Sequence, residues 1–104
     1  MLREFITKLD ADGDLVRVHQ PISRHLEAAG LLKALAGRPV LLEHIKESAY
    51  PVVGNVFSSR ALIARALGCA VDEIVGRLAQ AIEHPIPPAV VPVGAGPCQE
   101  VVEP

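Results

Sequence analysis

The stretch VLLEHIKESAYPVVGNVFSSR, residues 40–60, decides the fold. Two runs rich in Val, Leu and Ile, residues 40–45 and 52–57, flank six residues that are typical of a turn. Such runs bounded by turn residues predict two strands. A connection this short joins antiparallel neighbours far more readily than parallel ones. We therefore expect an antiparallel pair here, with the first strand the more central of the two.

The residues on either side of this pair predict a further strand and helices. Leu2, Phe5, Ile6 and Leu9 recur at the spacing of one helix face. Residues 15–19 alternate as a short strand does, and Ser23 is a suitable N-cap for a helix over residues 28–35. A third helix is expected from Ser58 or Ser59 to Gly68. The sum is an α/β (α+β) fold, in which a small three-stranded, mixed sheet packs with about four helices.

The fourth predicted helix has the clearest amphipathic pattern. Five apolar residues fall on one face of it and five polar residues on the other. We expect the apolar face to be buried and Leu78 to be a core residue. The apolar set is Val71, Ile74, Val75, Leu78 and Ile82, and the polar set is Asp72, Glu73, Arg77, Gln80 and Glu83.

The composition changes after His84. Five prolines and two glycines fall within residues 85–97, and they cannot sustain a helix or a central strand. We therefore predict a domain over residues 1–84 and a stiff, extended connector over residues 85–104. Val101 and Val102 resemble the first residues of another strand.

Composition and charge exclude several functional classes. A net charge of −2 and an aromatic content of 3% argue against a nucleic-acid partner, which would require a basic face and rings for stacking. No apolar run approaches the roughly 20 residues of a membrane span, and no signal-peptide pattern is present. Cys69 and Cys98 are too few for a disulfide scaffold. The expected protein works in the cytoplasm and binds neither membrane nor nucleic acid.

Local motifs give no catalytic, cofactor-binding or metal-binding residue. Residues 10–14, DADGD, resemble the start of an EF-hand loop. That loop needs Gly at its sixth position and Glu at its twelfth, which here are Leu15 and Pro21. A solvated acidic turn is the better interpretation. The four histidines lack the local spacing of zinc ligands, and neither cysteine lies where its thiolate would be stabilised.

Several blocks, taken in order, resemble UbiD-type decarboxylases. They are LREFI (2–6), LVRV (15–18), VLLEHI (40–45), PVVGNVFSSR (51–60), EHPIPP (83–88) and GPCQEVV (96–102). Together they span nearly the whole chain and match the N-terminal α/β domain of that family. Gly30 departs from the pattern, because the family tends to have a bulkier apolar residue there. Residues 92–95 are also irregular.

The resemblance implies reversible decarboxylation of aromatic, heteroaromatic or α,β-unsaturated acids with prenylated FMN, a divalent metal and a monovalent cation. It also implies a three-part, homo-oligomeric enzyme whose cofactor and catalytic residues belong to the middle domain. No catalytic, cofactor or metal residue can therefore be placed on this chain. The chain alone is expected to be inactive.

Two functional interpretations remain open. In the first, the chain is the non-catalytic N-terminal domain of a decarboxylase and packs on the flavin-binding domain of the same or a companion chain. In the second, it is a stand-alone binding or accessory subunit derived from that domain, with no chemistry of its own. The residues expected at the domain interface are Asn55, Ser58, Arg60, His84, Pro85, Pro87 and Pro88.

Overall fold

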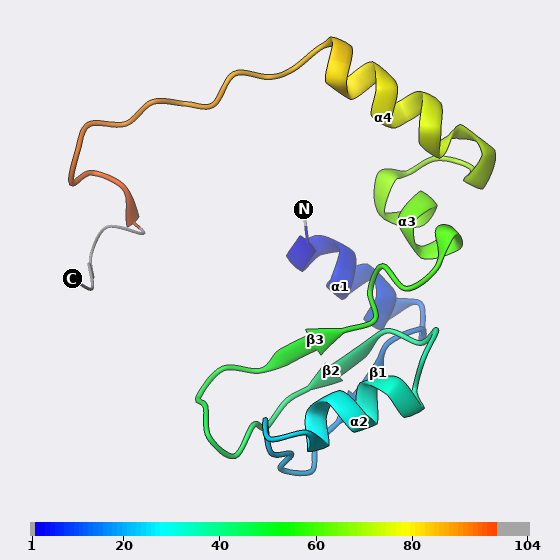
Figure 1. Cartoon of the computed structure of the whole chain (residues 1–104), viewed down its shortest axis with the longest axis vertical. Coiled ribbons are helices and arrows are strands. Elements are labelled where there is room, and N and C mark those ends of the chain that lie inside the picture. The colour runs from blue at the N-terminus through cyan, green and yellow to red at the C-terminus, as the bar shows by residue number, and fades with distance from the viewer. Residues whose placement is uncertain (1, 98–104) are drawn as a thin grey trace.

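The computed structural model describes residues 2–97, and over this range it confirms an α+β fold with a mixed sheet (Figure 1). Within those residues lie four α-helices, one short 3-10 helix and three strands. In chain order the elements are α1 (Leu2–Ala11), β1 (Val16–Val18), α2 (Glu27–Ala34), β2 (Val40–Leu42), β3 (Val52–Gly54), α3 (Arg60–Leu67), η1 (Val71–Glu73) and α4 (Ile74–Glu83).

The sheet has the order β1-β2-β3, so β2 is central as expected. β1 runs parallel to β2, with Val16 opposite Val40, and α2 makes the crossover that a parallel pair requires. β2 and β3 are antiparallel, which confirms the prediction from their short connection. Both strands end three residues earlier than expected, β3 because Asn55 turns the chain with a φ of 60°.

The core consists of two apolar clusters, one on each face of the sheet. Phe5, Leu9, Leu15, Val56 and Leu62 form the first, beside α1 and α3. Ile22, Val40, Leu42 and Ile45 form the second, on which α2 packs. Side chains of a strand alternate between faces, so Val40 and Leu42 join the α2 side while Leu41 joins the other. Helices therefore cover both faces of β2.

The predicted ends of α3 are confirmed, whereas the predicted N-cap of α2 is wrong. The Ser59 hydroxyl accepts a hydrogen bond from the Leu62 amide (3.2 Å), and Gly68 ends α3 in the left-handed region. Ser23 does not cap α2. Its hydroxyl accepts from the His25 amide (3.1 Å), and α2 begins four residues later, after Leu26 in a left-handed conformation. The intervening turn holds Ser23 one turn too far from the first helical amides.

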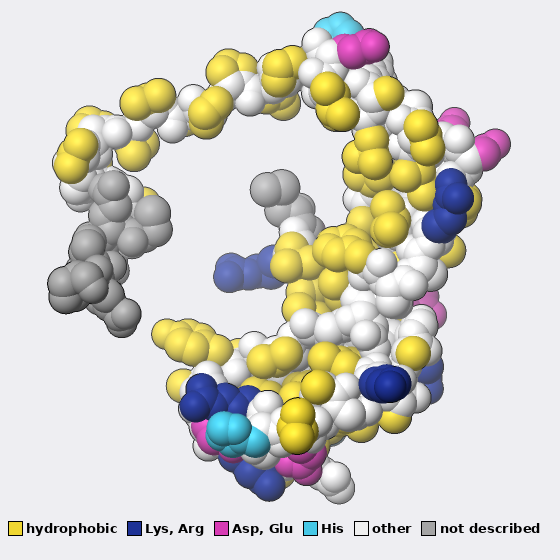
Figure 2. Space-filling view, viewed as in Figure 1, with side chains coloured by type: hydrophobic (Ala, Val, Ile, Leu, Met, Phe, Trp, Pro, Cys, Tyr) yellow, Lys and Arg dark blue, Asp and Glu magenta, His cyan; other side chains and the backbone are white. Residues whose placement is uncertain are grey.

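The prediction that α4 buries its apolar face is wrong for this chain. Among the ten residues of α4, all of which are described, only Ile74 is buried. Val75, Leu78 and Ile82 expose 69%, 47% and 79% of their surface. Figure 1 shows α4 projecting away from the sheet, and Figure 2 shows hydrophobic side chains lying open along it. The helix has the expected pattern, but no described element covers its apolar face.

The chain is more open than a compact domain of its size. Its Cα radius of gyration is 17.3 Å, where a compact domain of about 100 residues has roughly 13 Å. Its accessible surface is 8158 Å², against about 5,600 Å² for a compact monomer of this mass. Residues 85–96 form no helix or strand. Val101 and Val102 lie outside the described residues. No helix within residues 2–97 meets the length and hydropathy that a membrane crossing requires.

Candidate functional site

Asn55 joins the end of β3 to the end of α2. Its side-chain amide donates to the carbonyl oxygens of Leu32 (2.8 Å) and Leu35 (3.2 Å). Carbonyl groups in the last turn of a helix have no partner within the helix, and this amide satisfies that of Leu32. The Leu35 carbonyl also accepts a hydrogen bond from the Arg38 amide (3.0 Å). Asn is also one of the few residues that tolerate a positive φ. Asn55 was expected at a domain interface, and the structure gives it a role inside the domain.

Gly54 permits the close approach that brings Asn55 to α2. A β-carbon built at Gly54 would lie 2.5 Å from Cδ2 of Leu32 and 3.2 Å from its Cγ. Such distances are far below van der Waals contact, so only glycine fits unless Leu32 shifts. The sequence Gly54-Asn55 is therefore a joint between β3 and α2.

The remaining interface candidates are exposed and fall into two separate places. The Ser58 hydroxyl donates to the Asn55 carbonyl (2.8 Å), and Arg60 is the first residue of α3. His84 follows α4, with its Nδ1 3.2 Å from the Gln80 carbonyl oxygen. Pro85, Pro87 and Pro88 come after it and are exposed. Figure 1 shows the two groups at opposite ends of the run α3–η1–α4, so the structure does not bring them together. Their interface role stays a prediction.

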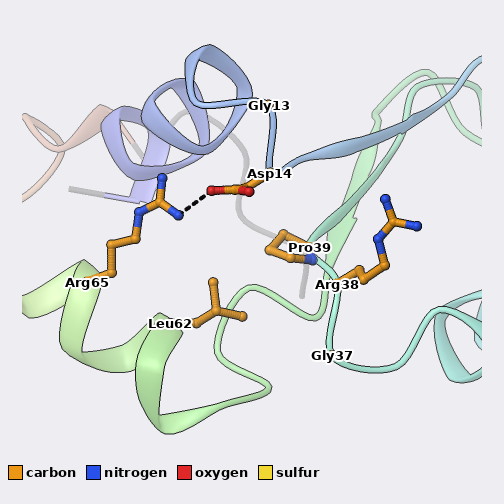
Figure 3. Close-up of a pocket in the computed structure, with 7 residues that line it drawn as sticks. All are labelled: Gly13, Asp14, Gly37, Arg38, Pro39, Leu62 and Arg65. Atoms are coloured by element: carbon orange, nitrogen blue, oxygen red, sulfur yellow. Dashed lines mark hydrogen bonds and ion pairs between the residues drawn. The ribbon is translucent and has the colours of Figure 1, made fainter.

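The acidic turn that resembles an EF-hand loop is an ion-paired joint. Arg65 on α3 binds Asp14 (Nη1 to Oδ2, 2.6 Å; Figure 3) and also binds Asp12. The hydrogen bond that Arg65 donates to Asp14 raises the pKa of Arg65, and the one that it donates to Asp12 adds to this effect. Gly13 supplies the positive φ of the turn. Two of the carboxylates that a cation would need are therefore already paired with an arginine.

A pocket of about 300 Å³ lies beside this joint, between α3, the α1–β1 turn and the start of β2. Figure 3 shows Pro39 and Leu62 at its centre, and Arg38 pointing away from the Arg65–Asp14 pair. Drug-sized ligands and cofactors occupy pockets from this size upward, in which apolar walls hold a few convergent polar groups. Here Arg65 and Asp14 bind each other, while the Arg38 side chain has no ion pair among the described residues.

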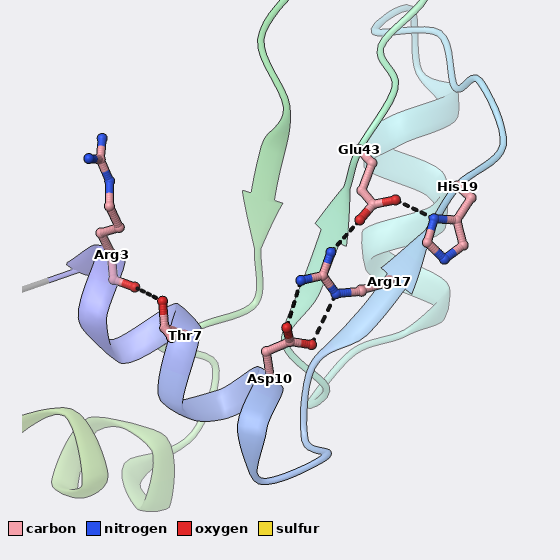
Figure 4. Close-up of polar contacts among 6 residues, drawn as sticks. All are labelled: Arg3, Thr7, Asp10, Arg17, His19 and Glu43. Atoms are coloured by element: carbon pink, nitrogen blue, oxygen red, sulfur yellow. Dashed lines mark hydrogen bonds and ion pairs between the residues drawn. The ribbon is translucent and has the colours of Figure 1, made fainter.

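A second polar network joins α1 to the sheet (Figure 4). Arg17 of β1 donates from Nε to Asp10 Oδ1 (3.0 Å) and from Nη2 to Asp10 Oδ2 (2.6 Å), and it also binds Glu43. Glu43 in turn binds His19. The Arg17 hydrogen bond lowers the pKa of Asp10; Arg17 first, and then His19, lower that of Glu43. Sequence reasoning missed this network, because no spacing rule links positions 10, 17 and 43.

The described residues do not fit a flavin or a metal ion. Within residues 2–97, no side chain that is polar or charged is buried, and no three His, Cys, Asp or Glu residues converge. Cys69 is half-buried and unpaired, and Cys98 lies outside the described residues.

Comparison with known proteins decides the family. The model of the 3-octaprenyl-4-hydroxybenzoate carboxy-lyase N-terminal domain matches residues 6–82. The chain belongs to the UbiD family. This confirms the resemblance found in the sequence blocks, and it assigns the matched region to the N-terminal domain of the family.

Individual relatives are decarboxylases or UbiD-class enzymes. Anhydromevalonate phosphate decarboxylase of Methanothermobacter thermautotrophicus is 34% identical over 86 residues, which are 83% of this chain and 20% of that protein. The structures of the UbiD-class enzyme HmfF of Pelotomaculum thermopropionicum, one with prFMN and one with FMN, match with a TM-score of 0.76 and 36% identity over 83% of this chain. The structure of vanillic acid decarboxylase of Sedimentibacter hydroxybenzoicus matches with a TM-score of 0.69 and 31% sequence identity over 96% of this chain.

The size of the match is as informative as its quality. The chain spans 20% of the HmfF chain and 23% of the vanillic acid decarboxylase chain. Those proteins are therefore several times longer than the part that this chain matches. One of the HmfF structures contains prFMN and the other contains FMN.

Proposed function

We propose that the chain serves as the non-catalytic N-terminal domain of a UbiD-class decarboxylase and packs on the flavin-binding domain of the same or a companion chain. The family match over residues 6–82 carries this proposal. The enzyme would act on aromatic, heteroaromatic or α,β-unsaturated carboxylic acids, in the cytoplasm, as a homo-oligomer. Bound prenylated FMN, with a divalent metal and a monovalent cation, would supply the electron sink for decarboxylation.

The role of this chain in such an enzyme is mechanical. Its sheet, covered by helices on both faces, gives a rigid body, and the joints at Gly54-Asn55 and at Arg65 fix α2 and α3 to it. A rigid domain beside a substrate cleft can form a wall of the cleft or close over it. The residues after His84 would connect this body to the flavin-binding domain. Pro-rich segments are stiff, so this connector would transmit a domain motion.

An accessory subunit is the second candidate function. The exposed face of α4 supports it, because a separate partner could cover that face equally well. In this case the chain would be a complete small protein that pairs with a flavin-bearing chain and has no chemistry of its own.

The test is to isolate the native product from source cells with an antibody against residues 2–83, and to record its mass and its flavin absorbance. We expect a product several times heavier than 11.0 kDa that carries flavin, whereas the purified 104-residue chain should be colourless and inactive. A product of 11.0 kDa bound to a separate flavin protein would support the accessory subunit. Absence of flavin from the product and from its companions would contradict both.

A further inference from the structure

The apolar stripe of α4 is a continuous exposed surface that no described residue covers. We define it as Val71, Val75, Leu78 and Ile82. The four residues are spaced by four, three and four positions, so they lie along one side of η1 and α4. All four are exposed within the described chain. Scattered apolar residues are ordinary on a protein surface, but a continuous stripe along a helix marks an interaction site.

The face of α4 opposite the stripe is polar, so the apolar surface of the helix is confined to one side. Glu73, Arg77 and Gln80 line an open hollow around Gly76, where an added β-carbon would meet nothing within 4 Å. This face is therefore solvated. A ten-residue helix is marginally stable by propensity alone, so its stability must come from packing of its apolar face. Within the described residues that face receives little beyond the contacts of Ile74.

The chain exposes 8158 Å², about 2,500 Å² more than a compact monomer of its mass. The extended residues 85–97 account for a large part of this excess, and the exposed stripe adds to it.

Chain continuity indicates which partner this is. The segment after α4 starts at His84, directly beyond the last residue of the stripe, and it continues with exposed Ile86 and Val90. Figure 1 shows this segment leaving from the outer end of α4. A domain tethered there would meet the stripe at high effective concentration. In HmfF, four-fifths of the chain lies outside the part that this chain matches.

We propose that the apolar stripe of α4 is the surface on which the flavin-binding part of the UbiD-class enzyme docks. This inference rests on the proposed function for the identity of the partner. It places the contact on the apolar stripe of α4, which the sequence-based interface candidates do not include, because those candidates lie at or before the first residue of α3 and after α4. Docking would bury Val75 and Ile82 and leave Gln80 in solvent.

The test uses photo-crosslinking in source cells, with benzoylphenylalanine placed at Ile82 or, as the matched control, at Gln80. Both positions lie on α4, on opposite faces, and both are exposed in this structure. We expect crosslinks from position 82 to flavin-binding sequence, in yields about tenfold above those from position 80, since interface positions contact the partner directly. With the photo-crosslinker at Val75, Ile82→Glu should abolish the product, whereas Gln80→Glu, which adds the same charge, should preserve it.

Three results would overturn the docking surface: equal yields from positions 82 and 80, a crosslink between two copies of this chain, or a crosslink to a protein without flavin-binding sequence. Circular dichroism of each variant checks that the domain remains folded. Flavin absorbance of the isolated product is a separate readout. Crosslinks from position 82 to the downstream domain without bound flavin would contradict the proposed function and leave the docking surface intact.

Discussion

At the scale of single residues, Asn55 has the most consequential contacts of the chain. It combines a positive φ with two hydrogen bonds that end α2, so its backbone and its side chain both fix the β3–α2 joint. Sequence reasoning treated Asn55 as an interface residue because of its place in a family-like block. The structure gives a physical reason for an amide at that position that needs no partner.

Asn55→Ala should lower the free energy of unfolding by about 1–3 kcal/mol, because the Leu32 carbonyl loses its donor and alanine resists the positive φ. Asn55→Gly should cost less, since glycine keeps the backbone conformation and loses only the hydrogen bonds. Urea denaturation of the purified chain measures both. A cost for Asn55→Ala below about 0.5 kcal/mol would show that the joint contributes little.

At the scale of elements, the fold depends on how closely α2 and α1 approach the sheet. Gly54 allows α2 to pack closely on β3. The Arg17 network holds the end of α1 against β1. Asp10 lies near the C-terminal end of α1, where a negative charge is unfavourable beside the helix dipole. Arg17 compensates that charge and ties the helix end to β1 and, through Glu43, to the chain just after β2.

Gly54→Ala should destabilise the chain by about 1–3 kcal/mol, because the new methyl group overlaps Leu32 and forces α2 outward. Gly30→Ala is the matched control on α2 itself. An added β-carbon meets nothing within 4 Å there, so alanine should stabilise the helix by about 1 kcal/mol. Thermal unfolding followed by circular dichroism should give opposite signs. The same sign for both would refute the close approach.

Acidification should weaken the α1–sheet contact. The folded pKa values of Asp10 and Glu43 lie below their ordinary values, so the unfolded chain binds more protons near pH 4. The stability contributed by these carboxylates is therefore present above about pH 4 and is lost as the pH falls below it. The thermal midpoint, measured at about pH 6 and about pH 3, should drop less in Arg17→Gln than in the parent chain. Arg24→Gln, which removes the same charge elsewhere, should behave like the parent.

At the scale of the whole molecule, the described chain is an α/β body from which a helical arm and an extended segment lead away (Figure 1). The two core clusters stabilise the body, while the stripe of α4 adds no comparable core. The size difference from the UbiD-class relatives agrees with a part that completes its packing against something larger. Stability and assembly are therefore expected to depend on different apolar residues.

Leu9→Ala and Leu78→Ala separate these two roles. Leu9 is fully buried, so its truncation should cost about 2–5 kcal/mol in the purified chain. Leu78 is half-exposed, and its truncation should cost less than about 1 kcal/mol there. Denaturant midpoints of the two variants give the comparison. Equal costs would mean that α4 packs on the core in solution, as its amphipathic pattern alone predicts.

The sequence by itself determined the type and order of the elements, because periodicity, caps and turns are local properties of the chain. It determined the antiparallel β2–β3 pair, the start of α3 to within Ser58 or Ser59, and the family, through short connections, capping residues and ordered blocks. Only the tertiary structure decided what α4 does. An apolar stripe predicts that one face of a helix is buried. Whether that face packs on its own domain or on a partner depends on the path of the chain between α3 and α4. The ion pairs of Arg17 and Arg65 also needed the fold, since they join residues that are brought together only by packing of the helices on the sheet.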